Sequence, residues 1–182
     1  MPQYRVLSAR RPAPLLEETV KKYSLIAVVA AAVDLLTKHG AERLLLEKDA
    51  YALTERLSFM LVYNTGGRDG LEAGPLTWAL HMLVTIAAIA LIASVVRAMA
   101  AVDARAIPAL GLVTGGAAGN LASMLVGPPG VADFLAVRIS EHTTVIANIA
   151  DLCLWTGAIM LVPVGLTLSR MIRLERAQKV AV

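Results

Sequence analysis

The sequence predicts a membrane protein of the all-α class, in which four transmembrane helices carry a small extracytoplasmic β element and both termini lie in the cytoplasm. The first observation is composition: 57% of the 182 residues are hydrophobic, 17% are charged, and the mean hydropathy is +0.66. These values lie outside the usual range of soluble domains. The second is that the charges gather between apolar stretches instead of recurring at a helical period, so the stretches are not amphipathic core helices. The third is an uneven distribution of Lys and Arg among the connecting segments, which sets the orientation.

Four apolar segments approach the length of about 20 residues that a helix needs to cross a bilayer. They are Tyr23–Leu36, Pro75–Val96, Ile107–Val126 and Val145–Leu168. The second is the most distinct, because Trp78 stands near its start as an interface anchor and Arg97 ends it. The first is the shortest and has Asp34 near its far end.

Orientation follows from the Lys and Arg residues near the ends of these spans. Most of them lie in three segments that we therefore place in the cytoplasm: residues 1–22, 97–105 and 170–179. The segments 38–74 and 127–144 are then outside. We expect a membrane domain over residues 23–169, between a cytoplasmic N-terminal tail of residues 1–22 and a basic cytoplasmic tail of residues 170–182.

The first outer segment contains a candidate strand. Leu57–Tyr63 combines apolar and aromatic residues over a strand-like length, and the sequence Asn64-Thr65-Gly66-Gly67 that follows is typical of a turn. We expect a small β element here.

Small residues form a stripe along the third span. Gly111, Gly115 and Gly119 recur at steps of four, which places them on one helix face and lets a neighbouring backbone approach closely. Ser123 continues the stripe. Asn120 lies next to it, and an amide in hydrocarbon is costly without a hydrogen-bond partner, so Asn120 either ties two helices together or belongs to a functional pocket.

Polar groups gather near the outer ends of three spans. Asp34 on the first, Asn120 with Ser123 on the third and Asp151 on the fourth all fall in the outer third of the bilayer, as judged from a rise of about 1.5 Å per residue. This placement predicts one outward-facing polar pocket. The alternative for the first span is a structural ion pair between Asp34 and Lys38, one turn apart.

The other reactive side chains indicate no further chemistry. Cys153 is the only cysteine, so it forms no disulfide within the chain, and we expect it to pack because no base accompanies it. Glu141 and His142 have no further ligand at metal-binding spacing, so we expect a solvated loop pair and no metal or other cofactor. Trp155 is expected to pack. The net charge of +3 is explained by the cytoplasmic segments, and we expect no nucleic-acid partner.

Five short blocks resemble the conserved blocks of the bacterial lipoprotein signal peptidases, the type II signal peptidases, in order and in topological placement. They are Asp34-Leu35-Leu36-Thr37-Lys38, Tyr63-Asn64-Thr65-Gly66, Gly115-Gly116-Ala117-Ala118-Gly119-Asn120, Val131-Ala132-Asp133-Phe134 and Asn148-Ile149-Ala150-Asp151. The resemblance implies a multi-pass protein of the bacterial plasma membrane, with four spans and a small β cradle outside. It also implies an aspartic protease that removes the signal peptide from diacylglyceryl-modified prolipoproteins with two aspartates, one on the third span and one on the fourth.

The site residues follow from the same resemblance. Asp151 matches the second catalytic aspartate, whereas Ser123 and Met124 stand where the family has the first aspartate and the Arg after it. Pocket or substrate-binding positions are implied for the remaining polar residues of the blocks: Asp34, Lys38, Asn64, Asn120, Asp133 and Asn148. Further departures from the family pattern are Ala147 and the pair Arg68-Asp69, at positions expected to contact substrate.

The serine at position 123 decides between two hypotheses about activity. Peptide hydrolysis by a carboxylate pair needs one group to activate water and one to donate a proton, and a serine hydroxyl takes neither role at ordinary pH. The first hypothesis is a catalytically degenerate family member that binds membrane lipids and acts as a binding or assembly subunit for lipoproteins or a larger membrane protein complex. The alternative is an active aspartic endopeptidase with a rearranged pair, in which Asp34 or Asp133 takes over the missing role.

Overall fold

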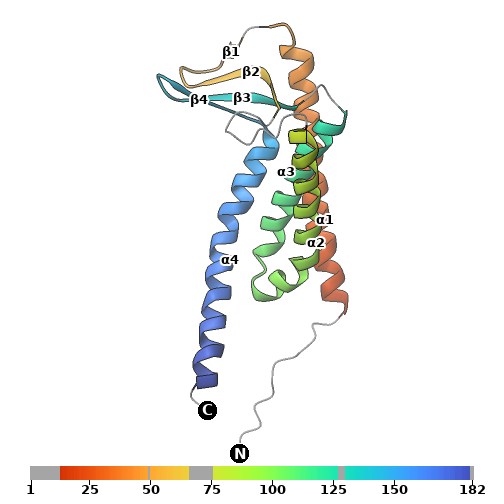
Figure 1. Cartoon of the computed structure of the whole chain (residues 1–182), viewed down its shortest axis with the longest axis vertical. Coiled ribbons are helices and arrows are strands. Elements are labelled where there is room, and N and C mark those ends of the chain that lie inside the picture. The colour runs from red at the N-terminus through yellow and green to blue at the C-terminus, as the bar shows by residue number, and fades with distance from the viewer. Residues whose placement is uncertain (1–12, 49, 66–75, 127–129, 181–182) are drawn as a thin grey trace, which may run out of the picture.

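The computed structural model describes residues 13–48, 50–65, 76–126 and 130–180. Along the chain its elements are α1 (Ala13–Leu45), β1 (Tyr51–Ala52), β2 (Leu57–Asn64), α2 (Thr77–Val102), α3 (Ala106–Val126), β3 (Val131–Ser140), β4 (Thr143–Ala147) and α4 (Ile149–Val180). The helices form an elongated bundle and the strands form one sheet across its end (Figure 1). The start of α1, the α2–α3 connection and the end of α4 all lie at the opposite end of the bundle.

Three helices in the described ranges are long and apolar enough to cross a membrane: α2, α3 and residues Ile149–Lys179 of α4. They correspond to the second, third and fourth predicted spans. The predicted first span lies in α1, which is not among them. Asp34 and Lys38 interrupt the apolar stretch of α1, although the helix runs for 33 residues.

Helix boundaries differ from the predicted spans in three places. α1 and α4 continue well beyond the predicted membrane domain, as far as Ala13 and Val180. α2 continues past Arg97 to Val102, so the predicted loop over residues 97–105 is mostly helical. The predicted start of the fourth span at Val145 is wrong, because residues 145–147 belong to β4, and α4 begins only at Ile149. The predicted start of the second span at Pro75 lies outside the described residues.

The strands form a four-stranded antiparallel sheet in the order β1-β2-β3-β4. The strand predicted over Leu57–Tyr63 is confirmed as β2, whereas β3 and β4 extend the sheet beyond the single element that the sequence indicated. Gly130 precedes β3 with φ of 114°, a conformation that favours glycine, and a Cβ on it would lie 2.9 Å from the carbonyl oxygen of Asn64. Of the predicted turn, Gly66 and Gly67 lie outside the described residues.

The glycine stripe of α3 faces α1, which confirms the predicted close approach. A Cβ on Gly111 would lie 2.9 Å from Cβ of Ile26, and one on Gly115 would lie 2.5 Å from the carbonyl oxygen of Ala27. The opposite face of α3 meets α4 in the same way, since a Cβ on Gly116 would lie 2.5 Å from the carbonyl oxygen of Ala150. α3 is therefore packed tightly between the first and last helices of the chain.

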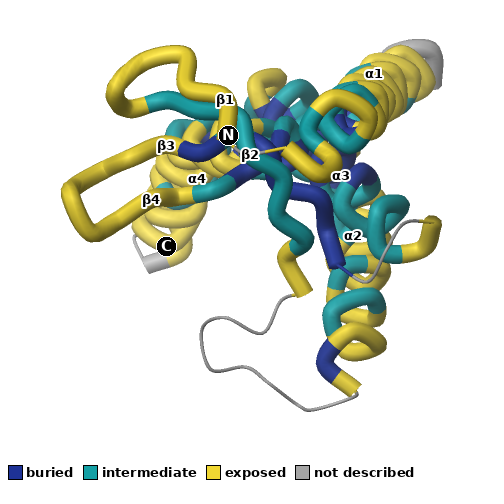
Figure 2. Tube along the Cα trace, turned by 90° about the horizontal axis from the view of Figure 1, so that it is seen from above, coloured by how far each residue is buried: buried dark blue, intermediate teal, exposed yellow. Residues whose placement is uncertain are grey.

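Burial follows this arrangement (Figure 2). Buried residues gather where the sheet crosses the helices, and the far ends of the strands are exposed. Large apolar side chains are exposed along α2 and α4, including Leu83 at 65% and Ile159 at 71%. An apolar exposed surface on helices of this length is the one that lipid covers.

Candidate functional site

Seven polar residues form one hydrogen-bonded network where the sheet meets the outer ends of the helices. They are the polar residues that the sequence blocks indicated: Asp34 and Lys38 of α1, Asn64 of β2, Asn120 of α3, Asp133 of β3, Asn148 before α4 and Asp151 of α4. Polar groups near the outer ends of the helices are therefore in mutual contact. Five elements contribute to the network.

Asp34 and Lys38 supply the α1 side of the network. Nζ of Lys38 lies 2.7 Å from Oδ2 of Asp34 and also donates to Oδ1 of Asn120 at 2.7 Å. Oδ1 of Asp34 accepts the backbone N–H of Ala150 at 2.8 Å. The predicted ion pair is therefore present, and it forms one edge of the polar network.

Asn148 and Asp151 cap the start of α4 reciprocally. The backbone N–H of Asp151 donates to Oδ1 of Asn148 at 2.9 Å, and the backbone N–H of Asn148 donates to Oδ2 of Asp151 at 3.1 Å. This is the geometry of a capping box, with Asn and Asp in its two positions. The cap fixes one oxygen of the Asp151 carboxyl group toward the helix start.

Asn120 holds the other oxygen of that carboxyl group. Its Nδ2 donates to Oδ1 of Asp151 at 3.2 Å, while its Oδ1 accepts from Lys38 and, at 3.2 Å, from Nδ2 of Asn148. Asn120 therefore joins α1 to α4 and also orients Asp151. The structural and functional interpretations of Asn120 do not exclude each other.

Asp133 connects the network to the sheet. Its Oδ1 accepts from Nδ2 of Asn148 at 2.6 Å and its Oδ2 from Nδ2 of Asn64 at 3.2 Å. Burial raises the pKa of Asp133 and the negative charge of Asp151 raises it further, although the two amide donors act in the opposite direction.

Ser123 does not join the described network. Its hydroxyl donates to the backbone carbonyl of Gly119 at 3.2 Å, one turn earlier in the same helix. This bond is the local back-bonding that serine commonly makes in helices. At this position α3 offers a short hydroxyl group and no carboxylate.

The three carboxyl groups of the network differ in access. Asp34 is 0% exposed and Asp133 is 4% exposed, whereas Asp151 is only partly buried. Asp151 is therefore the carboxylate that a ligand reaches most easily. A carboxylate held at both oxygens and open on one side is suited to act as a general base.

Four further side chains that the sequence analysis singled out lie outside the network. Glu141 and His142 lie exposed in the β3–β4 turn, and no group of potential ligands in the described ranges is arranged to hold a metal ion. Cys153 is half-buried in α4. The expected packing of Trp155 is wrong, because this side chain is 50% exposed on the outside of α4.

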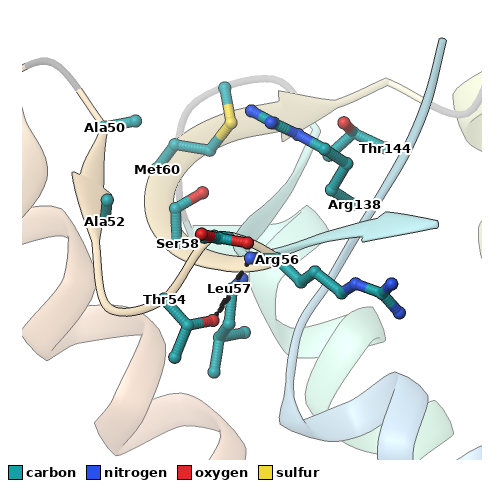
Figure 3. Close-up of a pocket in the computed structure, with 10 residues that line it drawn as sticks. Ala50, Ala52, Thr54, Arg56, Leu57, Ser58, Met60, Arg138 and Thr144 are labelled. Atoms are coloured by element: carbon teal, nitrogen blue, oxygen red, sulfur yellow. Dashed lines mark hydrogen bonds between the residues drawn. The ribbon is translucent and has the colours of Figure 1, made fainter. Parts of the chain in front are cut away.

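A separate hollow of about 260 Å³ lies on the sheet near the β1–β2 turn (Figure 3). Its lining includes Thr54, Ser58, Met60, Arg138 and Thr144, and none of the seven network residues lines it. In this view the Arg56 guanidinium points away from the hollow, and the Thr54 hydroxyl accepts the backbone N–H of Leu57 at 2.9 Å. The hollow is thus distinct from the polar network.

The sequence did not indicate the backbone contribution of Ala150 to the network. Its N–H is bound by Asp34, a residue 116 positions earlier. The identity of the residue at position 150 gives no signal for this contact, because any residue other than proline offers the same donor.

Comparison with known proteins identifies relatives of this chain. The model of the family described as Signal peptidase (SPase) II matches residues 26–166. The lipoprotein signal peptidase of Aquifex aeolicus is 34% identical over 149 residues, which cover 81% of this chain and 87% of that protein. The lipoprotein signal peptidase of Teredinibacter turnerae is 32% identical over 145 residues, which cover 78% of this chain and 84% of that protein.

Solved structures share the fold. A bacterial membrane enzyme matches with a TM-score of 0.70 at 24% identity, covering 79% of this chain and 91% of the other. A second structure of a bacterial membrane enzyme gives a TM-score of 0.68 at 23% identity, covering 81% and 88%. At these identities the similarity shows a shared fold, that is, the same arrangement of the helices and the sheet.

Proposed function

Because this chain belongs to the signal peptidase II family and is a bacterial membrane protein, we propose that it processes lipoprotein precursors in the membrane, with Asp151 as the catalytic carboxylate. The substrate class is a precursor whose signal peptide lies in the bilayer and whose lipid-modified residue reaches the outer surface. The observation that carries this proposal is Asp151 itself. Its two carboxyl oxygens are bound by Asn120 and Asn148, and it is the most exposed of the three acids in the network.

The chemistry assigned to Asp151 is proton transfer. As a general base it takes a proton from water, whose oxygen attacks the scissile carbonyl carbon, and the C–N bond then breaks as the leaving amine gains a proton. The hydrogen bonds from Asn120 and the Asn148 backbone hold the two oxygens of this carboxyl group in place. The amine takes the proton that Asp151 gained from water, because the Ser123 hydroxyl is unsuited to act as an acid.

The topology proposed for this activity has four spans. α1 packs against α3 along the glycine stripe from Gly111 to Gly119, so α1 lies beside a helix that is long enough to cross the membrane. The charged pair Asp34–Lys38 faces inward and is buried, which removes the main obstacle to placing α1 in the bilayer. Lys and Arg at the start of α1 and the end of α4 favour a cytoplasmic location for both termini.

The experiment compares the parent protein with Asp151→Asn on a diacylglyceryl-modified precursor in proteoliposomes, with an active family member beside them. The proposal predicts a product of the correct mass from the parent and none from Asp151→Asn. Ser123→Ala is the matched control, because it removes a side chain of the same site that bonds only to its own helix in the described structure. Cleavage by Asp151→Asn, or no cleavage by the parent beside a working relative, would overturn the proposal.

A second candidate function is binding without turnover, as a subunit or assembly partner for lipidated chains or for a larger membrane protein. The observation that favours it is the serine at position 123, where the family resemblance implies a carboxyl group. If that group is one of a cooperating pair, its loss typically costs several orders of magnitude in rate. This candidate predicts stable binding of the lipidated precursor with no product. Copurification from native membranes followed by mass spectrometry then identifies the bound chain.

A further inference from the structure

We propose that the cytoplasmic end of α4 binds anionic phospholipid headgroups, with Arg170 and Arg173 as the residues that hold the phosphate. These arginines belong to the last part of α4, residues 168–180, which lies beyond the residues 26–166 that the family model matches. The inference rests on the topology given with the proposed function, in which this end of α4 is cytoplasmic, and it does not depend on precursor cleavage. It gives the chain a lipid partner at the end opposite the polar network (Figure 1).

The depth of α4 in the membrane follows from its contact with the α2–α3 connection. The hydroxyl group of Thr167 donates to Oδ2 of Asp103, the residue that directly follows α2, at 3.4 Å. From Ile149 to Thr167 the helix rises about 27 Å, close to the hydrocarbon thickness of about 30 Å. Arg170 and Arg173 then follow about 5 and 9 Å beyond Thr167. Since the headgroup region adds about 5–8 Å on each side, both side chains are within reach of lipid phosphates.

The last part of α4 stands apart from the other described helices (Figure 1). Every residue from 170 to 179 is exposed. Three of these exposed side chains are large and apolar, namely Met171 at 44%, Ile172 at 41% and Leu174 at 65%. A helical segment that combines cations with exposed apolar side chains is typical of the headgroup boundary, where the apolar groups reach the acyl chains. A lipid therefore satisfies both kinds of side chain.

The positive charge of this segment is not neutralised within the described part of the chain. Its four cations recur about once per turn, and Glu175 is its only acid. None of the four forms an ion pair within the described residues. The cations are Arg170, Arg173, Arg176 and Lys179.

The start of α1, at the same end of the molecule, has the opposite arrangement. Each of its two lysines is paired with an acid one turn earlier. Lys21 lies 2.6 Å from Glu17, and Lys22 lies 2.8 Å from Glu18. Two helices thus extend from the same end of the bundle, and the cations of α4 are the ones that are available to an external anion.

A phosphate headgroup is the anion that fits these cations. A guanidinium group binds phosphate through two parallel N–H bonds, and three of the four cations are arginines. Basic segments that follow a transmembrane helix on the cytoplasmic side are attracted to anionic lipids, and each Lys or Arg near the surface contributes about fivefold in affinity. The position of the segment at the headgroup layer favours a lipid over a soluble polyanion.

The test measures lipid binding to the full chain in detergent by native mass spectrometry, with phosphatidylglycerol as the anionic probe and phosphatidylcholine as the neutral one. Arg170→Gln with Arg173→Gln should weaken phosphatidylglycerol binding by about 25-fold and leave phosphatidylcholine binding unchanged. Lys21→Gln with Lys22→Gln is the matched control, because it removes the same charge from the same end of the molecule. This control should stay within about twofold of the parent, since exposed paired lysines contribute little.

A second measurement needs neither double variant. A polarity-sensitive dye on the thiol of Leu174→Cys, in a Cys153→Ser background, should emit at shorter wavelength in liposomes that contain phosphatidylglycerol than in pure phosphatidylcholine. High salt should remove this difference, because it screens the attraction between exposed charges. Where Arg170→Gln with Arg173→Gln does not fold, the dye measurement decides alone.

Three results would overturn the inference. The first is equal weakening of phosphatidylglycerol binding by the arginine and the lysine variants, which would indicate net charge without a site. The second is a dye emission that is the same in both kinds of liposome. The third is displacement of the lipid by excess inorganic phosphate or by single-stranded DNA, which would make the segment a site for free phosphate or for nucleic acid. A parent protein that does not cleave precursor leaves all of these measurements unchanged, so the two proposals fail separately.

Discussion

Nζ of Lys38 lies 2.7 Å from Oδ2 of Asp34, one helical turn earlier in α1, and the two side chains are 4% and 0% exposed. A buried pair of this kind persists only where further hydrogen bonds satisfy both charges. Here Asn120 accepts from the ammonium group and the Ala150 N–H donates to the carboxylate. The Asp34–Lys38 pair therefore helps to hold the site together, and we expect its removal to lower the free energy of unfolding.

Lys38→Met should lower the free energy of unfolding by about 3–5 kcal/mol, because it leaves the Asp34 carboxylate buried without its cation. Thermal melts in detergent measure this loss. Lys21→Met is the control, since Lys21 pairs with Glu17 on the exposed surface of the same helix and such pairs contribute about 0–1 kcal/mol. Equal melting temperatures for Lys38→Met and the parent would show that the buried pair contributes nothing to stability.

Gly115→Ala should destabilise the bundle by about 1–3 kcal/mol, because its methyl group would lie 2.5 Å from the carbonyl oxygen of Ala27 and force α1 and α3 apart. Gly165→Ala in α4 is the matched control, since a Cβ there meets no atom within 4 Å. Melting temperatures in detergent compare the two. The close packing of α1 on α3 is contradicted if both variants melt like the parent.

Asp103→Asn should lower the melting temperature at neutral pH but not in strong acid. Side-chain and backbone hydrogen bonds with Arg105 hold the pKa of Asp103 at about 2, below its usual 3.8. The contribution of a carboxylate with a lowered pKa is present above its unfolded pKa and is lost as the pH falls through its folded pKa. The difference in melting temperature between Asp103→Asn and the parent should therefore shrink between about pH 4 and pH 2. A difference in melting temperature that stays constant over this range would exclude the Asp103–Arg105 ion pair as its cause.

Single cysteines in a Cys153→Ser background test the topology. Ala50→Cys and Glu141→Cys should react with a membrane-impermeant thiol reagent added outside, because both positions are exposed at the sheet end of the molecule. Gln178→Cys, near the exposed end of α4, should react only after the membrane is opened. The reverse pattern would place the sheet in the cytoplasm and rule out the proposed orientation.

The network could be predicted from the sequence because its members are polar residues in otherwise apolar surroundings. Asn120 and Asp151 lie within spans where an unpaired polar group is costly, so each had to find a partner. What the sequence could not show is the pairing itself, since Asp133 and Asn64 lie on strands whose register depends on the whole sheet.

The strands were harder to predict than the helices. β4 leads almost directly into α4, and only Asn148 interrupts the apolar run from Val145 where the strand ends. The boundary signal is Asn148 followed three residues later by Asp151, a capping pattern that marks the helix start and that we did not use. In β3 the buried stretch from Val131 to Phe134 does not alternate in exposure, which hides a strand from a period-two search.

The bond between Asp34 and the Ala150 N–H also bears on how the protein is made. It joins positions 116 residues apart, and α4, which is synthesised after α1, provides the donor. A ribosome-bound chain that ends before residue 148 has neither Asn148 nor Asp151, so its Asp34, Lys38 and Asn120 lack their later partners. The site is therefore complete only once α4 has been synthesised and has packed beside α1 and α3.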